Sequence, residues 1–364
     1  MKFSIIKNGV HTLRDSFAEK LAETFIDHGH ELSESPDNVQ FILNLTSIEN
    51  PKYYRRKSKY IAVITIVAEE IETSNMRASA YTTLIKSLSN LLLYLKPHRA
   101  NDLTAGRVYF TTPEAGFYST DFDLDKIYKA IMPIASARFA TDNKFETDLP
   151  VECWETTPIV EEMKHYGKVL NNLGVLPTPF PLNEVLAEEE LNHLYKIFGI
   201  TGASYGNLSA RENFPELGET AFWMTGRGVD KSNISIVGKD VLLVKEFNFD
   251  NGEAVLSMPV GFNPKARVSV DAVEHALIYK TFPEVGAIVH VHAWLDDIIC
   301  TTQNYPCGTT ELAKEVVEMI ELSENPNQTI VGLKNHGLTI TGYSLDDIFK
   351  RVIPKLKTEV EMFT

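Results

Sequence analysis

The sequence predicts an α/β protein built from two domains. Its length of 364 residues is enough for two hydrophobic cores. Short apolar runs rich in β-branched residues alternate with longer segments in which apolar residues recur every three or four positions. The composition, with 44% hydrophobic and 23% charged residues, is that of an ordinary globular protein. We place the boundary near residue 150, which gives a first domain of residues 1–150, of unknown role, and a second of residues 151–364.

The first domain shows strands and helices in alternation. Leu13, Phe17, Leu21 and Phe25 recur at a spacing of four, which predicts a helix over residues 12–28. The other elements expected here are an edge strand at 3–6, strands at 39–45, 60–67 and 107–111, and helices at 76–95 and 124–134. This alternation indicates a largely parallel sheet with helices packed on it. The half contains no Gly-x-Gly-x-x-Gly motif and no Walker-type phosphate loop, so nucleotide binding has no support there.

The second domain follows a polar, irregular stretch at residues 139–150. Asp250-Asn251-Gly252 between two apolar runs predicts a β-hairpin of strands 241–247 and 253–257. We expect helices at 158–173, 183–198, 269–281 and 309–322, a last helix from 344, strands at 329–333 and 338–340, and a stiff proline connector at 177–181. Residues 222–225 lead into a loop of small residues at 226–228.

Charge and hydropathy narrow the classes of partner. A formal net charge of -14 argues against general binding to nucleic acid or to a membrane surface. The basic and aromatic segment 52–59 could contact a phosphate, but a solvated loop explains it better in so acidic a chain. The apolar runs are too short for a signal peptide or a membrane span, and the three cysteines show no paired framework. We therefore expect a cytoplasmic protein with reduced thiols.

Two histidines stand out on an expected strand. Residues 286–294 read Gly-Ala-Ile-Val-His-Val-His-Ala-Trp, an apolar run typical of a buried strand, and side chains two apart share a face. His290 and His292 therefore project together, which suits a divalent metal, although two half-buried structural histidines would give the same pattern. The best third ligand is His336, in Leu-Lys-Asn-His-Gly. Three imidazoles leave a zinc position open for water or substrate, as in a catalytic site.

Several blocks around these histidines together resemble a known family, the class II aldolase/adducin family, over about residues 185–360. The blocks, in the family's order, are Gly206-Asn207-Leu208-Ser209-Ala210-Arg211, Met224-Thr225-Gly226-Arg227-Gly228, Asp271 to His275 with Phe282 to Val285 and His290-Val291-His292, Tyr305 to Ala313, and Asn335-His336-Gly337. The resemblance implies an α/β/α domain with a central, mostly antiparallel sheet. It also implies a divalent metal, expected to be zinc, held by His290, His292 and His336.

The resemblance further assigns substrate and catalytic positions. Phosphate-binding positions match Asn207, Thr225, Gly226 and Ser269, and the catalytic acid matches Asp271. Two departures stand out. The family's enzymes usually carry glutamate where this chain has Asp271, and the aldolases place a second serine where it has Val270, whose side chain cannot donate a hydrogen bond. Arg211 or Arg227 could supply the missing phosphate contact, or the substrate could lack a phosphate ester.

Asp271 also has a purely structural explanation. It lies at the start of the expected helix 269–281, where a carboxylate is good capping chemistry. Glu274 lies three residues on, near the same helix face, and could act as the acid instead. We rank Asp271 first because its spacing to His275 and His290 matches the family.

The function implied by the resemblance is that of a metal-dependent aldolase, a lyase. Such an enzyme cleaves or forms a carbon–carbon bond in a small sugar phosphate or related hydroxy-carbonyl compound through a metal-stabilised enediolate. Two alternatives remain open: an epimerase or dehydratase using the same ligands, and a non-catalytic, adducin-like assembly module. The family's enzymes form rings, commonly fourfold, so the resemblance also implies a homotetramer acting on a small molecule.

Overall fold

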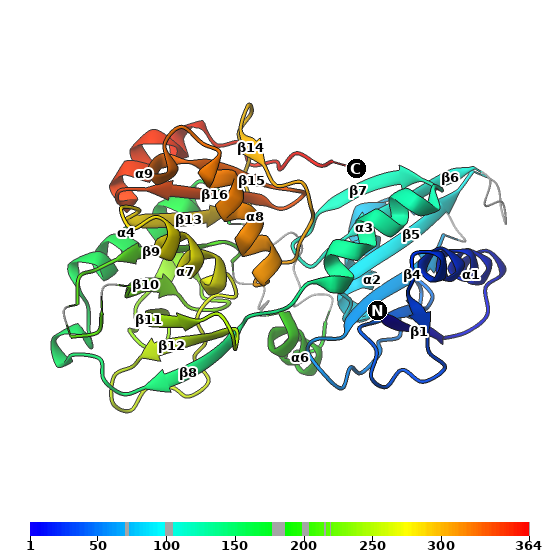
Figure 1. Cartoon of the computed structure of the whole chain (residues 1–364), viewed down its shortest axis with the longest axis horizontal. Coiled ribbons are helices and arrows are strands. Elements are labelled where there is room, and N and C mark those ends of the chain that lie inside the picture. The colour runs from blue at the N-terminus through cyan, green and yellow to red at the C-terminus, as the bar shows by residue number, and fades with distance from the viewer. Residues whose placement is uncertain are drawn as a thin grey trace. The chain divides into compact units, whose positions relative to one another are not determined.

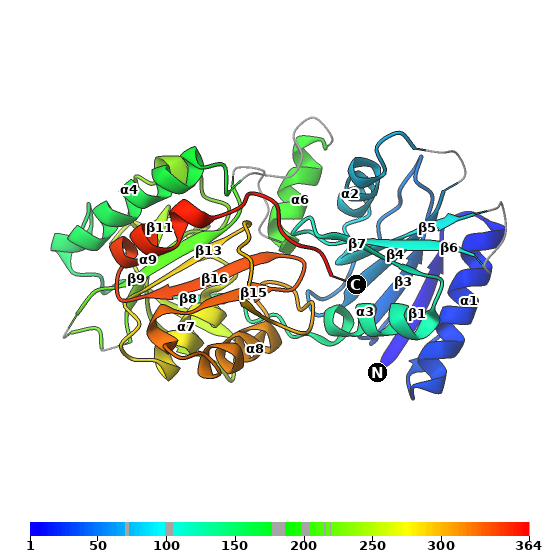
Figure 2. The same cartoon turned by 90° about the horizontal axis from the view of Figure 1, so that it is seen from above.

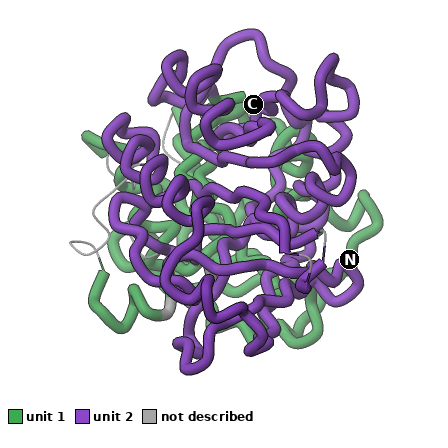
Figure 3. The backbone as a smooth tube through the Cα atoms, turned by 90° about the vertical axis from the view of Figure 1, so that its left-hand side faces the viewer, with its two compact units in different colours: residues 1–137, 183–198, 362–364 green, residues 138–182, 199–361 purple. Residues whose placement is uncertain are grey.

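A computed structural model of the whole chain describes residues 1–69, 73–98, 105–176, 186–198, 204–214, 216–218 and 220–363. The chain divides into two compact units, one of residues 1–137, 183–198 and 362–364, the other of residues 138–182 and 199–361 (Figure 3). Contacts within the chain thus group residues 138–150 with the second unit, and the division near residue 150 stays a prediction. The proline connector 177–181 and the start of the helix expected from residue 183 lie outside the described residues.

The first unit contains a seven-stranded sheet in the order β2-β1-β3-β4-β5-β6-β7. The first four pairings are parallel, which agrees with the largely parallel sheet expected from the alternating elements, and the last two are antiparallel. The strands are β1 (Lys2–Lys7), β2 (Glu31–Leu32), β3 (Phe41–Leu45), β4 (Ala62–Ala68), β5 (Leu91–Pro97), β6 (Gly106–Thr111) and β7 (Phe117–Asp121). Helices α1 (Thr12–Asp27) and α3 (Leu124–Ser136) cover one face, α2 (Met76–Lys86) covers the other, and α6 (Glu188–Phe198) is also grouped with this unit (Figure 2).

Two expectations for this unit were wrong. The segment 76–95 is not one helix, because α2 ends at Lys86, Leu88 has a left-handed φ of 53°, and β5 follows. A continuous apolar run such as residues 91–95 fits a strand buried on both faces as well as a helix, so periodicity could not separate them. The first strand is not at the edge either, because β1 pairs with both β2 and β3.

The second unit contains a nine-stranded sheet in the order β14-β15-β16-β13-β9-β10-β11-β12-β8. Its six central pairings are antiparallel and the pairing at each edge is parallel, which confirms the mostly antiparallel expectation. The strands are β8 (Asp142–Glu146), β9 (Asn207–Arg211), β10 (Phe222–Thr225), β11 (Val241–Asn248), β12 (Glu253–Ser257), β13 (Ala287–Val291), β14 (Ile299–Cys300), β15 (Ile330–Leu333) and β16 (Gly337–Gly342) (Figure 1). Strand β8 arises in the stretch read as irregular, because pairing with β12 orders residues whose own pattern is polar.

Helices cover both faces of this sheet, which confirms the α/β/α expectation. Figure 2 shows α7 (Ala272–Thr281) and α8 (Thr310–Glu321) on one face, with α4 (Pro158–Asn172) and α9 (Leu345–Arg351) on the other. A large core of buried apolar side chains joins α7 and α8 to strands β10, β11 and β12. The sheet face that α7 covers also carries polar side chains, among them Ser209, which hydrogen-bonds to His275 of α7. In the part of the chain that is described, no helix is both long enough and apolar enough to cross a membrane.

Candidate metal centre

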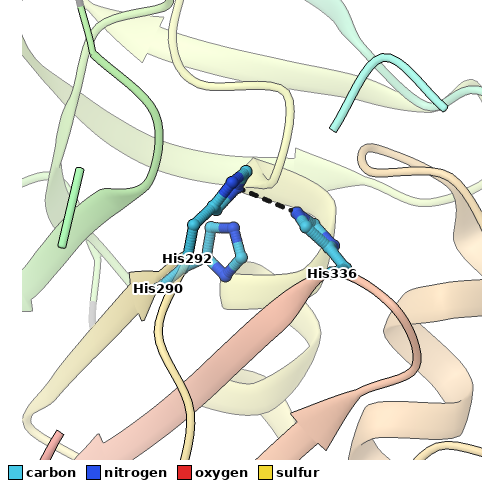
Figure 4. Close-up of side chains that lie close together, drawn as sticks. All are labelled: His290, His292 and His336. Carbon is cyan, nitrogen blue, oxygen red and sulfur yellow. Dashed lines mark hydrogen bonds between the residues drawn. The ribbon is translucent and has the colours of Figure 1, made fainter. Parts of the chain in front are cut away.

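Three histidines converge where two neighbouring strands of the second sheet, β13 and β16, end and begin. His290 lies in β13, His292 directly after it, and His336 in the turn between β15 and β16 (Figure 4). The ring centroids are 5.3 Å apart for His290 and His292, and His336 lies 4.7 Å from each. The ligand atoms of all three lie within 4.8 Å of one another. The structure thus brings together the side chains that spacing and resemblance had grouped.

The turn that carries His336 depends on its two neighbours. Asn335 has a φ of 59°, a left-handed conformation that asparagine tolerates better than most residues. At Gly337 an added Cβ would lie 2.3 Å from the carbonyl oxygen of Val291, so only glycine allows the turn to approach β13 this closely. The His336 amide donates to the Leu333 carbonyl at 3.0 Å and closes the turn. The Asn-His-Gly sequence therefore fixes the third ring against the strand that carries the first two.

The protonation of these histidines suits metal binding. His290 Nδ1 lies 3.0 Å from the carbonyl oxygen of Leu338, so it donates its hydrogen there and leaves Nε2 with a free lone pair. Burial lowers the pKa of His290, and lowers the pKa of His292 and His336 well below their usual range. The three rings are consequently neutral, the form in which imidazole binds a cation.

The close contact between two rings tests whether a metal fits. His336 Nε2 lies 3.1 Å from His292 Nε2, the contact dashed in Figure 4. Two nitrogens bound to one tetrahedral zinc at about 2.0–2.1 Å would lie roughly 3.3 Å apart. The observed separation therefore leaves the rings close to the positions that one ion requires. Tyr205 stacks on the face of His292 with centroids 4.7 Å apart, which helps to fix the orientation of that ring.

Asp271 lies beside this cluster and is not used as a helix cap. It occupies the N-cap position of α7, yet its side chain makes no capping hydrogen bond. Its Oδ2 instead accepts a hydrogen bond of 2.7 Å from Asn207 Nδ2. Oδ1 is buried without a partner among the described residues, and a carboxyl oxygen of Asp271 lies within 4.8 Å of a His290 ligand nitrogen. This geometry removes capping as the reason for an acid at this position.

Glu274 occupies a different environment. It is buried and accepts a hydrogen bond of 2.6 Å from Thr339 Oγ1, on the strand next to β13. Burial, followed by the charge of Asp271, raises the pKa of Glu274 above its usual range. The side chain is therefore protonated at neutral pH and engaged within the sheet. Of the two acids, Asp271 is the one that has an unpartnered buried oxygen and that lies within ligand distance of His290.

The four residues matched to phosphate binding lie on adjoining segments. Asn207 begins β9 opposite His290. The amide of Leu208, which follows Asn207, donates to Thr225 Oγ1 at 3.4 Å. Gly226 follows Thr225 and bridges to Val268, while the Ser269 amide donates to the Thr225 carbonyl at 3.1 Å. Their use by a phosphate stays a prediction, and residues 199–203, which precede this region, lie outside the described residues.

The two arginines considered as substitutes for a second serine have structural partners. The Arg211 guanidinium donates to the Tyr279 carbonyl and lies 4.7 Å from the centroid of the Tyr279 ring. Arg227 donates to the Thr141 carbonyl at 3.2 Å.

Thr309, in the block of residues 305–313, is the N-cap of α8, since its hydroxyl accepts from the Leu312 amide.

Sequence reasoning missed a buried lysine near the site. Lys231, in the short 3-10 helix η2 (Lys231–Asn233), is 2% exposed and donates from Nζ to the Ser204 carbonyl at 3.1 Å. Burial lowers its pKa to about 7, and the charge of Asp271 acts in the opposite direction. A single lysine between Asp230 and Ser232 belongs to no periodic pattern and no motif, so its position near the site could not be predicted from the sequence.

A family profile matches this part of the chain. Residues 189–296 match the profile described as the class II aldolase and adducin N-terminal domain, which includes His290 and His292. These residues form a class II aldolase/adducin domain. The match to this domain confirms the family resemblance of the C-terminal region.

Proteins similar to the class II aldolase/adducin domain include two from Leptospira. A methylthioribulose-1-phosphate dehydratase of Leptospira interrogans serogroup Icterohaemorrhagiae is 33% identical over 148 residues, which cover 38% of this chain and 53% of that protein. The dehydratase of the same name from Leptospira biflexa serovar Patoc is 27% identical over 151 residues, which cover 40% of this chain and 66% of that protein. The chain thus spans between about half and two thirds of the length of these curated relatives.

Solved structures similar to this chain include an L-fuculose 1-phosphate aldolase, with 19% identity and a TM-score of 0.36 over 54% of this chain and 81% of that one. An aldolase II superfamily protein from Pseudomonas syringae has 16% identity and a TM-score of 0.29 over 54% of this chain and 73% of that one.

Proposed function

We propose that the second unit is a zinc-dependent lyase acting on a small phosphorylated hydroxy-carbonyl compound, and that its reaction is the removal of water. The observation that carries the proposal is the buried Asp271 carboxylate, which has one unpartnered oxygen and lies next to His290, one of three neutral imidazoles that converge. A carboxylate placed in this way can take a proton from a carbon next to a carbonyl. A metal held by His290, His292 and His336 supplies Lewis-acid stabilisation of the charge that develops on the carbonyl oxygen.

The residues of the chain account for each proton in this reaction. In a substrate with a hydroxyl on each of the two carbons that follow the carbonyl, Asp271 takes the proton from the first of these carbons, and the electron pair forms a double bond between the two. The hydroxyl on the second carbon leaves as water with the proton from Asp271. The product is an enol, whose hydroxyl proton passes to solvent while a solvent proton adds to the second carbon, which gives a second ketone. Asn207 orients the carboxylate through its 2.7 Å hydrogen bond, and the buried position keeps other water from the enol.

Dehydration is favoured over carbon–carbon cleavage by the relatives, because both Leptospira proteins are named as dehydratases. Aldol cleavage is the second candidate, since the blocks around the histidines resemble the aldolases and the two reactions begin from the same polarised carbonyl. Epimerisation would use the same ligands. A scaffold role like that of adducin has no need of a buried acid and three convergent imidazoles. The proposal further includes a homotetramer and a cytoplasmic location, which rest on the resemblance and on the composition.

Product analysis tests the proposal. The zinc-loaded full chain is incubated with methylthioribulose 1-phosphate and, separately, with fuculose 1-phosphate. Dehydration gives a product lighter by one water in mass spectrometry, whereas aldol cleavage gives dihydroxyacetone phosphate in a coupled assay. We expect water loss from the first compound. Dihydroxyacetone phosphate without any dehydrated product would establish the aldolase instead.

Two variants test the assignment of the acid. Asp271→Asn should keep its zinc and lose roughly 10²–10⁴-fold in turnover, the usual contribution of general acid–base catalysis. Glu274→Gln is the matched control, because it neutralises a buried acid three residues away that faces Thr339. A large loss in Glu274→Gln with an active Asp271→Asn would reverse the two roles.

A further inference from the structure

His292 is the histidine of the cluster that the sheet supports least. It follows Val291, the last residue of β13, and it is half-buried, whereas His290 and His336 are buried. Its ring stacks on Tyr205 with centroids 4.7 Å apart. Groups that fix the orientation of a ligand ring raise the affinity of a site for its metal. The position of Tyr205 therefore bears on metal binding.

The peptide group that joins Ser204 to Tyr205 is held at both ends. Its carbonyl oxygen, on Ser204, accepts from Lys231 Nζ at 3.1 Å, and its amide, on Tyr205, donates to the Leu176 carbonyl at 3.2 Å. The Ser204 hydroxyl adds a third bond, to the Val229 carbonyl at 2.9 Å. Because a peptide group is planar and rigid, these contacts fix the direction in which the Tyr205 side chain leaves the backbone.

Lys231 is not the side chain that packing alone would select at this position. It is 2% exposed, and burying an amine costs free energy that an apolar side chain of similar size would not. Burial lowers the pKa of Lys231 to about 7, and the charge of Asp271 opposes that effect, which places the lysine within reach of the site's carboxylate. A methionine here could not donate to the Ser204 carbonyl. The hydrogen bond is therefore what distinguishes the lysine from an apolar residue.

Helix α4 holds the backbone of Lys231. At Gly167, in α4, an added Cβ would lie 2.4 Å from the Lys231 carbonyl oxygen and 3.1 Å from Ile234 Cδ1, so glycine lets the helix lie directly against η2. Asp230 caps η2 and accepts from the Ser232 amide at 2.9 Å. The lysine thus extends from a fixed backbone to the carbonyl that it binds.

We propose that Lys231 is a positioning residue of the metal centre, which holds the peptide between Ser204 and Tyr205 and so keeps the Tyr205 ring against His292. The inference rests on the metal centre of the proposed function and extends it by a residue that acts through Tyr205 rather than on the ion. Its consequence differs from that of a structural contact. Replacing Lys231 by an apolar residue weakens zinc binding in a protein that is no less stable, because the cost of burying the amine disappears with it.

A double-mutant cycle on zinc affinity tests the proposal. The Kd for zinc is measured at neutral pH, by competition with a colorimetric chelator, for wild type, Lys231→Met, Tyr205→Ala and the double variant. Each single replacement should raise Kd about 10–100-fold, the range for groups that orient a metal ligand. The double variant should lose no more than the larger single effect, since both residues act through one ring. Lys239→Met is the matched control, because Lys239 is an exposed lysine of the same unit, 3.7 Å from Asp240, and should keep the wild-type Kd.

The outcomes separate this proposal from the metal centre itself. A wild-type Kd in Lys231→Met, or losses that multiply in the double variant, would overturn the positioning role and leave the three-histidine centre standing. Failure of the wild type to bind zinc would overturn both. A lower melting temperature of metal-free Lys231→Met with an unchanged Kd would mean a purely structural contact. If Lys231→Met does not fold, Lys231→Gln takes its place in the cycle, because its amide is one bond closer to the backbone and does not reach the Ser204 carbonyl.

Discussion

Replacing Gly206 with alanine should damage the metal centre through the backbone alone. Gly206 precedes β9 and has a φ of +73°, and an added Cβ would lie 2.5 Å from the His290 carbonyl oxygen and 2.7 Å from Leu176 Cδ2. The left-handed conformation costs an alanine about 1–2 kcal/mol. Ordinary contact begins at 3.4 Å, so the segment must move by about 0.9 Å, and such overpacking costs about 1–3 kcal/mol more.

The position of the clash determines what is lost. Asn207 pairs with His290 in the β9–β13 ladder, so a shift at Gly206 moves the amide that orients Asp271 and the strand that carries the ligand. We expect Gly206→Ala to lower the free energy of unfolding of this unit by about 2–5 kcal/mol. For a domain of roughly 150–250 residues, each kcal/mol lowers the melting temperature by about 2–4 °C. Zinc retained after dialysis should fall as well.

Gly261→Ala is the matched control for the backbone conformation. Gly261 has a φ of +78° in the same unit, but a Cβ there meets nothing within 4 Å. It should lose only the conformational part, about 1–2 kcal/mol, and keep its zinc. Differential scanning calorimetry and metal analysis of the two variants give the comparison. Equal melting temperatures and equal zinc contents would refute the argument from the His290 contact.

Three further predictions concern metal binding, stability and assembly. His292→Ala should lose its zinc in metal analysis, whereas the exposed His165→Ala should keep it; equal contents would remove the three-histidine site. Lys231→Met should be stabilised relative to wild type most strongly below pH 7. Burial lowers the pKa of Lys231 in the folded protein to about 7, whereas unfolded lysine titrates near 10.4. As the pH rises between those values, the free energy of unfolding of the wild type should therefore increase by up to about 1.4 kcal/mol per pH unit from this group, and that of the variant should not. Urea unfolding at pH 6, 8 and 10 measures the free energy of unfolding of both proteins. A difference between variant and wild type that does not change with pH would contradict the prediction. Light scattering should show a homotetramer, and a monomer at every concentration would exclude one.

The local parts of the site followed from the sequence, and the long-range parts did not. The alternation in residues 286–294 placed His290 and His292 on one face, and His336 was the best third ligand, a choice that the resemblance then supported; the structure brings all three together. The rank of Asp271 over Glu274 rested on spacing, and the hydrogen bonds of the two acids now support it. Their roles stay predictions.

Lys231 donates to the Ser204 carbonyl and Cys307 Sγ lies 3.3 Å from His336 Nε2, and both contacts join segments far apart in the chain. No periodicity encodes such contacts, and neither residue type is unusual in its own segment. The error at residues 76–95 has a different cause. A strand buried on both faces has no polar side, so its sequence lacks the alternation that distinguishes a strand from a helix.

The ligand strands lie in the interior of their sheet, with consequences for how an ion is exchanged. Strand β13 pairs with β9 and β16, and β16 pairs with β13 and β15. Fraying of either strand would have to break hydrogen bonds on two sides, so the amides of these strands should exchange with deuterium only at a free energy close to that of global opening. The lifetime of a bound ion is then set by rotation of side chains within an intact sheet. Chelators should remove the metal without unfolding the protein, and the three histidines should keep positions in which they can bind another ion.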